Sequence, residues 1–431
     1  MSSLDIGLIS LLCMVVLVYA GLYVPIALAL CSFAGVWAIK GSPVLASKLL
    51  ALAAYDSISS YIFGVVPLFV LMGMIVSVAD IGRDTFDVAN RLLGKIKGGL
   101  GVATVAANAV FAAITGISIA SAAVFTKVAV PEMLRFGYAP RFAVGIVAGS
   151  SVLGMLIPPS LLLILYGVLT EQSVGDLFIA GILPGLLLAG AFAIAIVFMA
   201  RKETPLPQKP QEKDLQGFEI FWKITPIVLL VSLVLGGIYG GLFTPTEAGA
   251  VGALGALVIA LFKRKMTGKA FWNVVVETGH VTASICFLII AANMYSRMLS
   301  LSGVPGFFGD WIVAGELGFW SVLLLYVLVV LLLGTILDSS SIMLILIPLV
   351  LPIMMDMGVD LIWFGIVTVL AVEIGLLTPP LGIAAFVIKG TLDDDRITLG
   401  DIFRGAFPFA LIMLVVLGLI IAFPVISTAL L

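Results

Sequence analysis

The chain is short of charge. Only 11% of its 431 residues are Asp, Glu, Lys or Arg and 62% are hydrophobic, whereas a soluble domain carries about 25% charged residues. Long apolar runs such as 322–337 and 407–423 approach the length that spans a hydrocarbon core of about 30 Å. These runs lack the period-two alternation of barrel strands, so they predict helices. The expected fold is an all-α polytopic membrane protein embedded in a lipid bilayer.

Histidine, cysteine and basic clusters are scarce as well. The sequence has one histidine and no His-Glu-x-x-His, Gly-x-Ser-x-Gly or phosphate-loop motif, so we do not expect an enzyme. The three cysteines lie in apolar runs without ligand spacing, which favours packing roles over metal binding or disulfides. With a net charge of −2 and no basic face, nucleic acid is not an expected partner. The N-terminus lacks the basic region of a signal peptide, so the first apolar run is expected to remain as a span.

One unusual phrase occurs twice. The segment GMLIPP at 154–159 returns 221 residues later as GLLTPP at 375–380. Two adjacent prolines remove two backbone donors, so neither segment can be an unbroken helix. Within a bilayer, broken backbone is tolerated only where it is buried in protein or lines a cavity. Two such breaks in corresponding positions of two halves indicate the binding site of a transporter.

Two further apolar runs carry small polar residues in the middle. Run 98–128 is interrupted at 115–121, and run 319–352 at 334–341. Each run is either one long span or a re-entrant hairpin, and the distribution of basic residues decides between them. Lys and Arg cluster in five loops, at 83–97, 135–141, 201–223, 263–269 and 389–404, and are absent from 170–176, 299–320 and 356–361. Basic loops are expected on the cytoplasmic side of the membrane. All five basic loops lie on that side only if both runs are hairpins, and this arrangement places Lys40 and Lys48 on the opposite side.

The hairpin reading predicts ten crossings with both termini periplasmic. The expected spans lie near 5–20, 23–39, 57–78, 142–166, 177–200, 223–241, 246–262, 274–298, 360–388 and 402–424. The offset of 221 also relates Ser118 to Ser339 and Pro131 to Pro352, so the halves are expected to form an inverted structural repeat. The predicted domains are N-terminal scaffold helices at 1–97, a first transport region with one hairpin and one broken helix at 98–200, a cytoplasmic linker at 201–223, further scaffold helices at 224–315, and a second transport region with the final helix at 316–431.

The hairpin tips and the broken helices are the candidate cation sites. A helix break exposes carbonyl oxygens, which suit a hard cation such as sodium, and N–H groups, which suit a carboxylate. The first candidate site comprises Thr115, Gly116, Ser118, Gly154 and Pro158, and the second comprises Gly334, Asp338, Ser339, Gly375, Thr378 and Pro379. The alternative is that these residues only shape kinks between packed helices. The duplication favours two or more sodium ions.

Three ionisable residues lie in apolar segments, where each costs about 2.5–3.5 kcal/mol on insertion scales. Asp338 is expected to neutralise a bound cation. Arg297 either pairs with a substrate carboxylate or extends to the membrane interface. Glu373 is either functional or structural, and in the second case it pairs with a hydroxyl or a backbone N–H. The candidate substrate contacts are Arg297, Ser118, Ser340 and Ser150.

Four segments carry a family resemblance. They are PLFVLMG at 67–73, LIPPS at 156–160, FTPTEA at 243–248 and EIGLLTPP at 373–380. With them the whole chain resembles the large membrane subunit, or M subunit, of the tripartite ATP-independent periplasmic (TRAP) transporters. The resemblance implies an elevator-type ion transporter fold, with sodium bound at both tips and an organic acid between them. It also implies a bacterial inner membrane location and two partners, a small four-helix membrane subunit and a soluble periplasmic substrate-binding protein.

The sequence leaves some of these points open. The tips Ile117-Ser118-Ile119 and Ser339-Ser340-Ser341 depart somewhat from the Ser/Thr- and Ala-rich tips of the family, which leaves the individual ligands open. No four additional spans precede Met1, so the small subunit is expected to be a separate chain. The alternative function is a stand-alone anion/sodium symporter of similar fold that needs no binding protein. Sugar acids, C4-dicarboxylates, keto acids and ectoine-like compounds all remain possible substrates.

Overall fold

The computed structural model describes residues 1–59, 64–94, 96–203, 217–307, 315, 318–335, 337–379, 382–392, 394 and 396–431. Every regular element in these ranges is a helix, which confirms the predicted all-α class. The first half contains α1 (Ser3–Tyr19), α2 (Val24–Lys40), α3 (Pro43–Ser59), α4 (Val65–Val78), α5 (Ile81–Leu93), α6 (Gly99–Thr115), α7 (Ser118–Arg135), α8 (Pro140–Ser151), α9 (Leu153–Leu156), α10 (Leu161–Thr170) and α11 (Val174–Glu203). The second half contains α12 (Gly217–Tyr239), α13 (Pro245–Phe262), α14 (Gly268–Ser302), α16 (Phe319–Gly334), α17 (Ser339–Asp356), α18 (Leu361–Leu377), α19 (Ile383–Thr391), α20 (Leu399–Ala422) and α21 (Val425–Thr428).

Many of these helices have the length and composition of membrane spans. Within the described ranges, seven helical segments are long and apolar enough to cross a bilayer. They are Pro140–Thr170, Val174–Ala200, Phe218–Tyr239, Pro245–Phe262, Gly268–Ser302, Ser339–Asp356 and Leu399–Ala422. The pair α4–α5, bent by 63°, would make an eighth. The chain is therefore a polytopic membrane protein, and the count of ten crossings stays a prediction.

Two helices were not predicted. The first is α3, which continues to Ser59, whereas α4 begins at Val65. The predicted start of the span at 57–78 is therefore wrong. The loop expected at 83–97 is also wrong, because it contains most of α5. This helix buries Ile81, Phe86 and Val88 while its charged residues face the other way. An average over a hydropathy window hides such an amphipathic helix, because polar and apolar positions cancel.

Charged residues fasten α5 to the helices that follow the central linker. The Asp84 carboxylate pairs with Lys223 Nζ of α12 at 3.5 Å and also with Lys263 Nζ of α13. Lys223 pairs in addition with Asp87, one turn further along α5. The Asp84 side chain is only 16% exposed, so solvent screens these pairs weakly. The cluster fixes one end of the bent α4–α5 pair.

The helices α6 and α7 fold back on each other. Gly116, between them, has φ of +64°, a left-handed conformation that favours glycine. The rings of Phe111 on α6 and Phe125 on α7 lie 5.7 Å apart, edge to face. A continuous helix would separate these residues by about 21 Å, at about 1.5 Å per residue. The interruption predicted at 115–121 is therefore a sharp reversal of the chain.

The first double proline interrupts a long helical segment as predicted. The helix α9 ends at Leu156, and α10 begins at Leu161. Ser160 joins the two sides of the break, because its hydroxyl donates to the Met155 carbonyl and accepts from Leu163 N at 3.2 Å. This hydroxyl supplies a partner for one of the first amides of α10, which have none within the helix. The break is thus a defined structure with its own hydrogen bonds.

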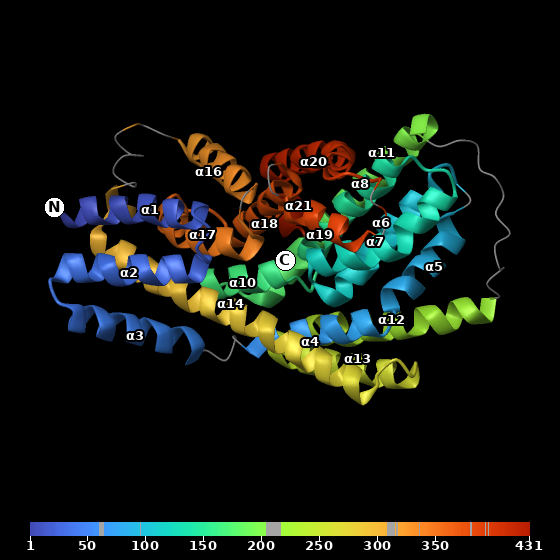
Figure 1. Ribbon diagram of the computed structural model, residues 1–431, viewed down its shortest axis with the longest axis horizontal. Helices are drawn as coiled ribbons and strands as arrows, with labels where there is room; N and C mark the ends of the chain where they lie inside the picture. The colour runs from blue at the N-terminus through green and yellow to red at the C-terminus, as the bar shows by residue number, and fades with distance from the viewer. Residues whose placement is uncertain are drawn as a thin grey trace.

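The second half repeats this arrangement around α18. The helices α16 and α17 lie in the half of the molecule that holds the N-terminus, whereas α6 and α7 lie in the other half (Figure 1). Both pairs reach the middle of the molecule, where α16 and α17 contact α18. The helix α18 ends at Leu377, and α19 begins at Ile383. Pro379 lies in this second interruption, whereas Pro380 lies outside the described residues.

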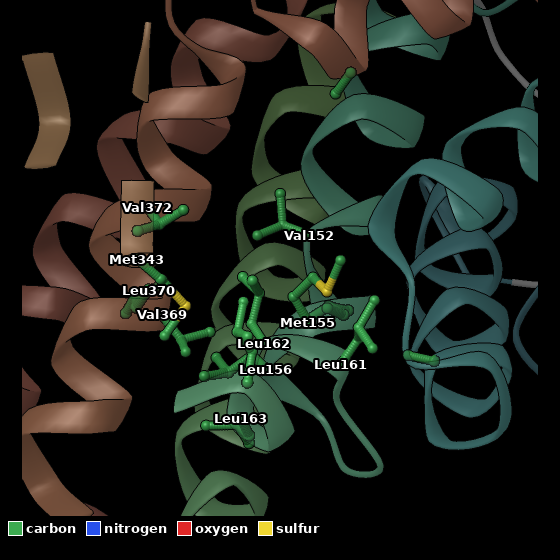
Figure 2. Close-up of a cluster of buried hydrophobic side chains, with 14 of the residues drawn as sticks. Val152, Met155, Leu156, Leu161, Leu162, Leu163, Met343, Val369, Leu370 and Val372 are labelled. Atoms are coloured by element: carbon green, nitrogen blue, oxygen red, sulfur yellow. The ribbon is translucent and has the colours of Figure 1, made fainter. Parts of the chain in front are cut away.

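The core at the centre joins the two halves. Figure 2 shows Leu156 and Leu162 of the first broken segment close to Val369 of α18, with Val152 in the same cluster. Met343 of α17 and Val372 of α18 complete this side of the cluster. All these side chains are buried. The two interrupted helices therefore share one apolar core.

Candidate functional site

The first tip packs directly on the first helix break. Leu161 N, just after the double proline, donates to the Gly116 carbonyl at 3.2 Å. A Cβ atom on Gly116 would lie 2.4 Å from the Pro159 carbonyl oxygen, and one on Gly154 would lie 3.0 Å from Ser118 N. Only glycine fits such close backbone contact. The structure therefore brings Gly116, Ser118, Gly154 and the double proline together, and their role in cation binding stays a prediction.

The second tip packs on the second break in a similar way. Cβ atoms built on Gly334 and Gly375 would each come within 2.6 Å of the other residue's Cα. Gly334 ends α16 and Gly375 lies in the last turn of α18, so the two helices touch backbone to backbone. Thr378 Oγ1 donates to the Ile374 carbonyl at 2.7 Å at the end of α18. The candidate residues Gly334, Gly375 and Thr378 thus belong to one cluster.

Asp338 is the N-cap of α17. Its carboxylate accepts from Ser341 N at 3.1 Å and from the Ser341 hydroxyl. An aspartate at this position stabilises the first turn of a helix, because it accepts from an amide that has no partner within the helix. Ser340, two residues after Asp338, is half-buried. The predicted roles of Asp338 in cation binding and of Ser340 in substrate binding stay predictions.

A single carboxylate joins the two tips. Glu373 is 1% exposed and lies on α18, one turn or less from Gly375. Its Oε2 accepts from Ser118 Oγ at 2.8 Å, and its Oε1 accepts from Ser339 Oγ at 3.2 Å. Ser118 and Ser339 begin α7 and α17, so each lies at the start of a return helix. Of the two roles considered for Glu373, the structure shows the pairing with a hydroxyl, and it shows this pairing twice.

Two candidate substrate contacts have partners of their own. Arg297 Nη2 pairs with Asp56 Oδ2 of α3 at 2.6 Å, and both side chains are about half exposed. Ser150 accepts from Asn108 Nδ2 at 2.6 Å, where α6 packs against α8. Asn108 Oδ1 is buried without a hydrogen-bond partner among the described residues. The structure connects Arg297 to α3, and its predicted contact with substrate stays a prediction.

A large cavity lies beside the first return helix. Its volume is about 970 Å³, and residues of α5, α7 and α12 line it. The wall carries charges of both signs, including Arg83, Asp87, Lys127 and Lys223. Sequence reasoning missed this cavity, because it treated the residues of α5 as a loop.

The geometry defines a class of protein. Two interrupted helices meet two folded-back helix pairs at the centre of a helical membrane protein, and the hydroxyls of two serines donate to one buried carboxylate. Oxygen atoms of this kind bind hard cations. Interrupted helices with exposed ends at mid-membrane are typical of secondary transporters.

Comparison with known proteins gives the family. The family model for the tripartite ATP-independent periplasmic transporter, DctM component, matches residues 11–426. The chain therefore belongs to this family of TRAP transporter large permease proteins. The C4-dicarboxylate large permease protein DctM of Pseudomonas aeruginosa is 36% identical over 384 residues, which cover 89% of each chain. The sialic acid large permease protein SiaM of Vibrio cholerae is 32% identical over 83% of each chain.

A solved structure supports the fold. The YdaH transporter of Alcanivorax borkumensis matches with a TM-score of 0.63 over 89% of this chain and 90% of its own. Its sequence is only 14% identical, so the likeness extends to the fold alone. The resemblance first suggested by the double-proline segments is thus confirmed at the level of the family and of the fold class.

Proposed function

We propose that the chain is the large permease subunit of a transporter that imports an organic carboxylate across the bacterial inner membrane, driven by a sodium gradient. The observation that carries this proposal is the packing of each serine-bearing tip on an interrupted helix, once in each half. The two large permease proteins described above are named for C4-dicarboxylates and sialic acid, both of which are carboxylic acids. The shared chemistry supports a carboxylate as the substrate and does not select one compound.

Sodium would bind where carbonyl and hydroxyl oxygens converge at each tip. The proposed ligands of the first ion come from Thr115, Gly116, Ser118, Gly154 and Pro158, and those of the second from Gly334, Asp338, Ser339, Gly375, Thr378 and Pro379. The close glycine contacts support this proposal, because they leave backbone carbonyls within reach of the tips. Bound sodium would order both tips, and the substrate would then dock between them near Ser118 and Ser340, with Ser150 and Arg297 as further candidates.

Transport would proceed by an elevator movement. Regions 98–200 and 316–431 would move together, because they share one apolar core at the centre (Figure 2). Helices from 1–97 and 224–315 would form the scaffold, held together by contacts such as those of α14 with α2 and α4. The charged cavity beside α7 lies between the two parts. It provides a polar route by which an anion can leave toward the basic, cytoplasmic side.

The partners follow from the tripartite organisation of the family. We propose that a small four-helix membrane subunit binds the scaffold and that a periplasmic binding protein delivers the substrate. Both termini would then be periplasmic, as the distribution of basic loops indicates. Transport rather than catalysis is the proposed activity of the chain.

Reconstitution tests the proposal. The partner binding protein is first screened against carboxylic acids by thermal shift, because a ligand that binds the folded state raises the melting temperature. The permease with its small subunit is then placed in liposomes, and uptake of the identified acid is measured under an inward sodium gradient. We expect uptake only with the binding protein present and only with sodium. Uptake by the chain alone would favour a stand-alone symporter. Unchanged uptake with choline in place of sodium would show that sodium is not the coupling ion.

A further inference from the structure

The strongest unassigned feature is the position of Glu373 between the tips. Each of its two carboxylate oxygens accepts from a different serine, Ser118 at 2.8 Å and Ser339 at 3.2 Å. These serines are 221 positions apart in sequence, which is the offset of the duplicated double-proline segments. One side chain therefore holds equivalent positions of both halves at once.

The carboxylate lacks a charged partner among the described residues. Its hydrogen bonds come from two neutral hydroxyls. On α18, the buried side chains of Val369 and Val372 come one turn and one residue before it. Burial of a negative charge in such surroundings is costly unless a cation neutralises it. Because the local dielectric constant is low, this charge acts strongly on any cation held nearby.

Other charges lie far along their helices or have other partners. Lys127 of α7 is nine residues beyond Ser118, about 13 Å along the helix. The Asp338 carboxylate is bonded to Ser341. In the described helices that pack against α18, every charged residue lies within about two turns of a helix end. These residues are Asp176, Asp338, Asp356, Lys389, Asp401 and Arg404 and those in 201–203. Glu373 is thus the negative charge in direct contact with both tips.

The two halves differ at this position. The residue that corresponds to Glu373 at the offset of 221 is Val152, which is buried at the start of the first break. The first tip therefore lacks an equivalent carboxylate of its own from α8 or α9. If each tip holds a cation, the same carboxylate serves both.

The direction of the hydrogen bonds also favours cation binding. Ser118 and Ser339 each donate their hydroxyl proton to Glu373. A hydroxyl oxygen has two lone pairs, which remain available once its proton is engaged. Because each serine donates its proton to Glu373, its oxygen is free to act as a ligand for a cation at the same tip.

We propose that Glu373 is the shared counter-charge and positioning residue of the two cation sites. This inference rests on the proposed binding of sodium at the tips. The carboxylate holds both serines with their lone pairs directed away from it and supplies the negative charge that both ions sense. Binding of one ion therefore affects binding of the other, because both interact with the same side chain.

The test measures equilibrium binding of radioactive sodium to the purified complex of permease and small subunit. Glu373→Gln keeps the shape of the side chain and removes the charge. We expect the sodium concentration for half-saturation to rise about 10- to 100-fold, with the number of sites retained. Glu373→Asp keeps the charge and should recover most of the affinity. Glu247→Gln is the matched control, since Glu247 also accepts from a hydroxyl, that of Thr244, but in an exposed capping box.

Serine variants test the positioning role. Ser118→Ala and Ser339→Ala each remove one hydrogen bond to Glu373, and each should weaken sodium binding about 3- to 10-fold. When combined with Glu373→Gln, neither should add its full effect, because the variants disrupt the same unit. Ser151→Ala is the control, since this buried hydroxyl donates to the Ala148 carbonyl of its own helix.

The outcomes separate the two proposals. If wild-type protein binds sodium and Glu373→Gln binds it with the same affinity, the shared counter-charge is wrong while sodium binding stands. If wild-type protein shows no saturable sodium binding, the proposal that sodium is the coupling ion is wrong, and the inference about Glu373 is wrong with it. Should Glu373→Gln unfold, the serine variants decide, and wild-type sodium affinity in both Ser118→Ala and Ser339→Ala would overturn the inference.

Discussion

Replacement of Gly375 by alanine should break the contact between the second tip and the second helix interruption. A Cβ atom at this position would lie 2.5 Å from Gly334 Cα and 2.9 Å from Gly334 C. Ordinary contacts between such atoms are about 3.5–4.0 Å, so α16 and α18 must separate by about 1 Å. Gly334 has no side chain that could yield, and the displacement therefore falls on the backbone of the tip.

The magnitude follows from this displacement. Overpacking of this kind costs about 1–3 kcal/mol of stability. A shift of about 1 Å at a site that must hold its ligands in place lowers a rate about 100-fold. We therefore expect Gly375→Ala to lower uptake about 100-fold and to lower the melting temperature of the complex by a few degrees.

The assay compares Gly375→Ala with Gly418→Ala in proteoliposomes and in thermal unfolding. Gly418 lies inside α20, and a Cβ atom there would meet open space. Alanine at such a position favours the helix by about 1 kcal/mol, so this variant should keep its uptake and melting temperature or gain stability. Wild-type uptake and stability in Gly375→Ala would refute the close packing of the second tip.

Three other variants test separate parts of the structure. Asp338→Asn keeps a good N-cap for α17 but removes a charge from the second tip, so uptake should fall to background while the protein still inserts; activity at the wild-type level would remove Asp338 from the site. Ser160→Ala removes the cap from the Leu163 amide, which should cost about 1 kcal/mol and lower the melting temperature, and an unchanged value would contradict the role of the cap. Asp84→Asn leaves two lysines of α12 and α13 without their shared charge and should cost about 1–3 kcal/mol. Because these pairs are weakly screened, the loss should change little as salt rises, and a loss that disappears at high salt would contradict the partly buried pairing.

The interruptions of the helices could be predicted because their signals are local. Adjacent prolines forbid a continuous helix whatever surrounds them, and the repeat of 154–159 at 375–380 then pointed to two sites. Glycine has no side chain to prevent close backbone approach, and the structure shows that approach at 154, 334 and 375. Local chemistry and duplication therefore located the centre of the protein.

The role of Glu373 could not be predicted in the same way. The sequence marked it as an ionisable residue in an apolar run, but its partners lie 255 and 34 positions away. A contact between residues so far apart in sequence depends on how α7, α17 and α18 pack. A hydropathy profile does not predict this packing. The only available signal was that Ser118 and Ser339 occupy equivalent positions in the two halves. If the two tips meet, both hydroxyls can donate to one common acceptor.

The pairing of Arg297 with Asp56 was missed for a related reason. Asp56 lies near the end of α3, a helix that the sequence analysis did not assign, so no carboxylate was expected beside α14. The amphipathic α5 was missed because its charges suggested a loop. Helices that combine charge with a buried face are the elements for which hydropathy alone fails.

The most direct test of the account is the number of sodium ions that the purified complex binds. We predict saturable binding of at least two ions per permease chain. Gly154→Ala and Gly375→Ala should each lose one ion and retain the other, because each disturbs the packing of one tip on one interrupted helix. No saturable sodium binding to the wild type, or full wild-type binding in both glycine variants, would contradict the claim that the duplicated interruptions form two cation sites.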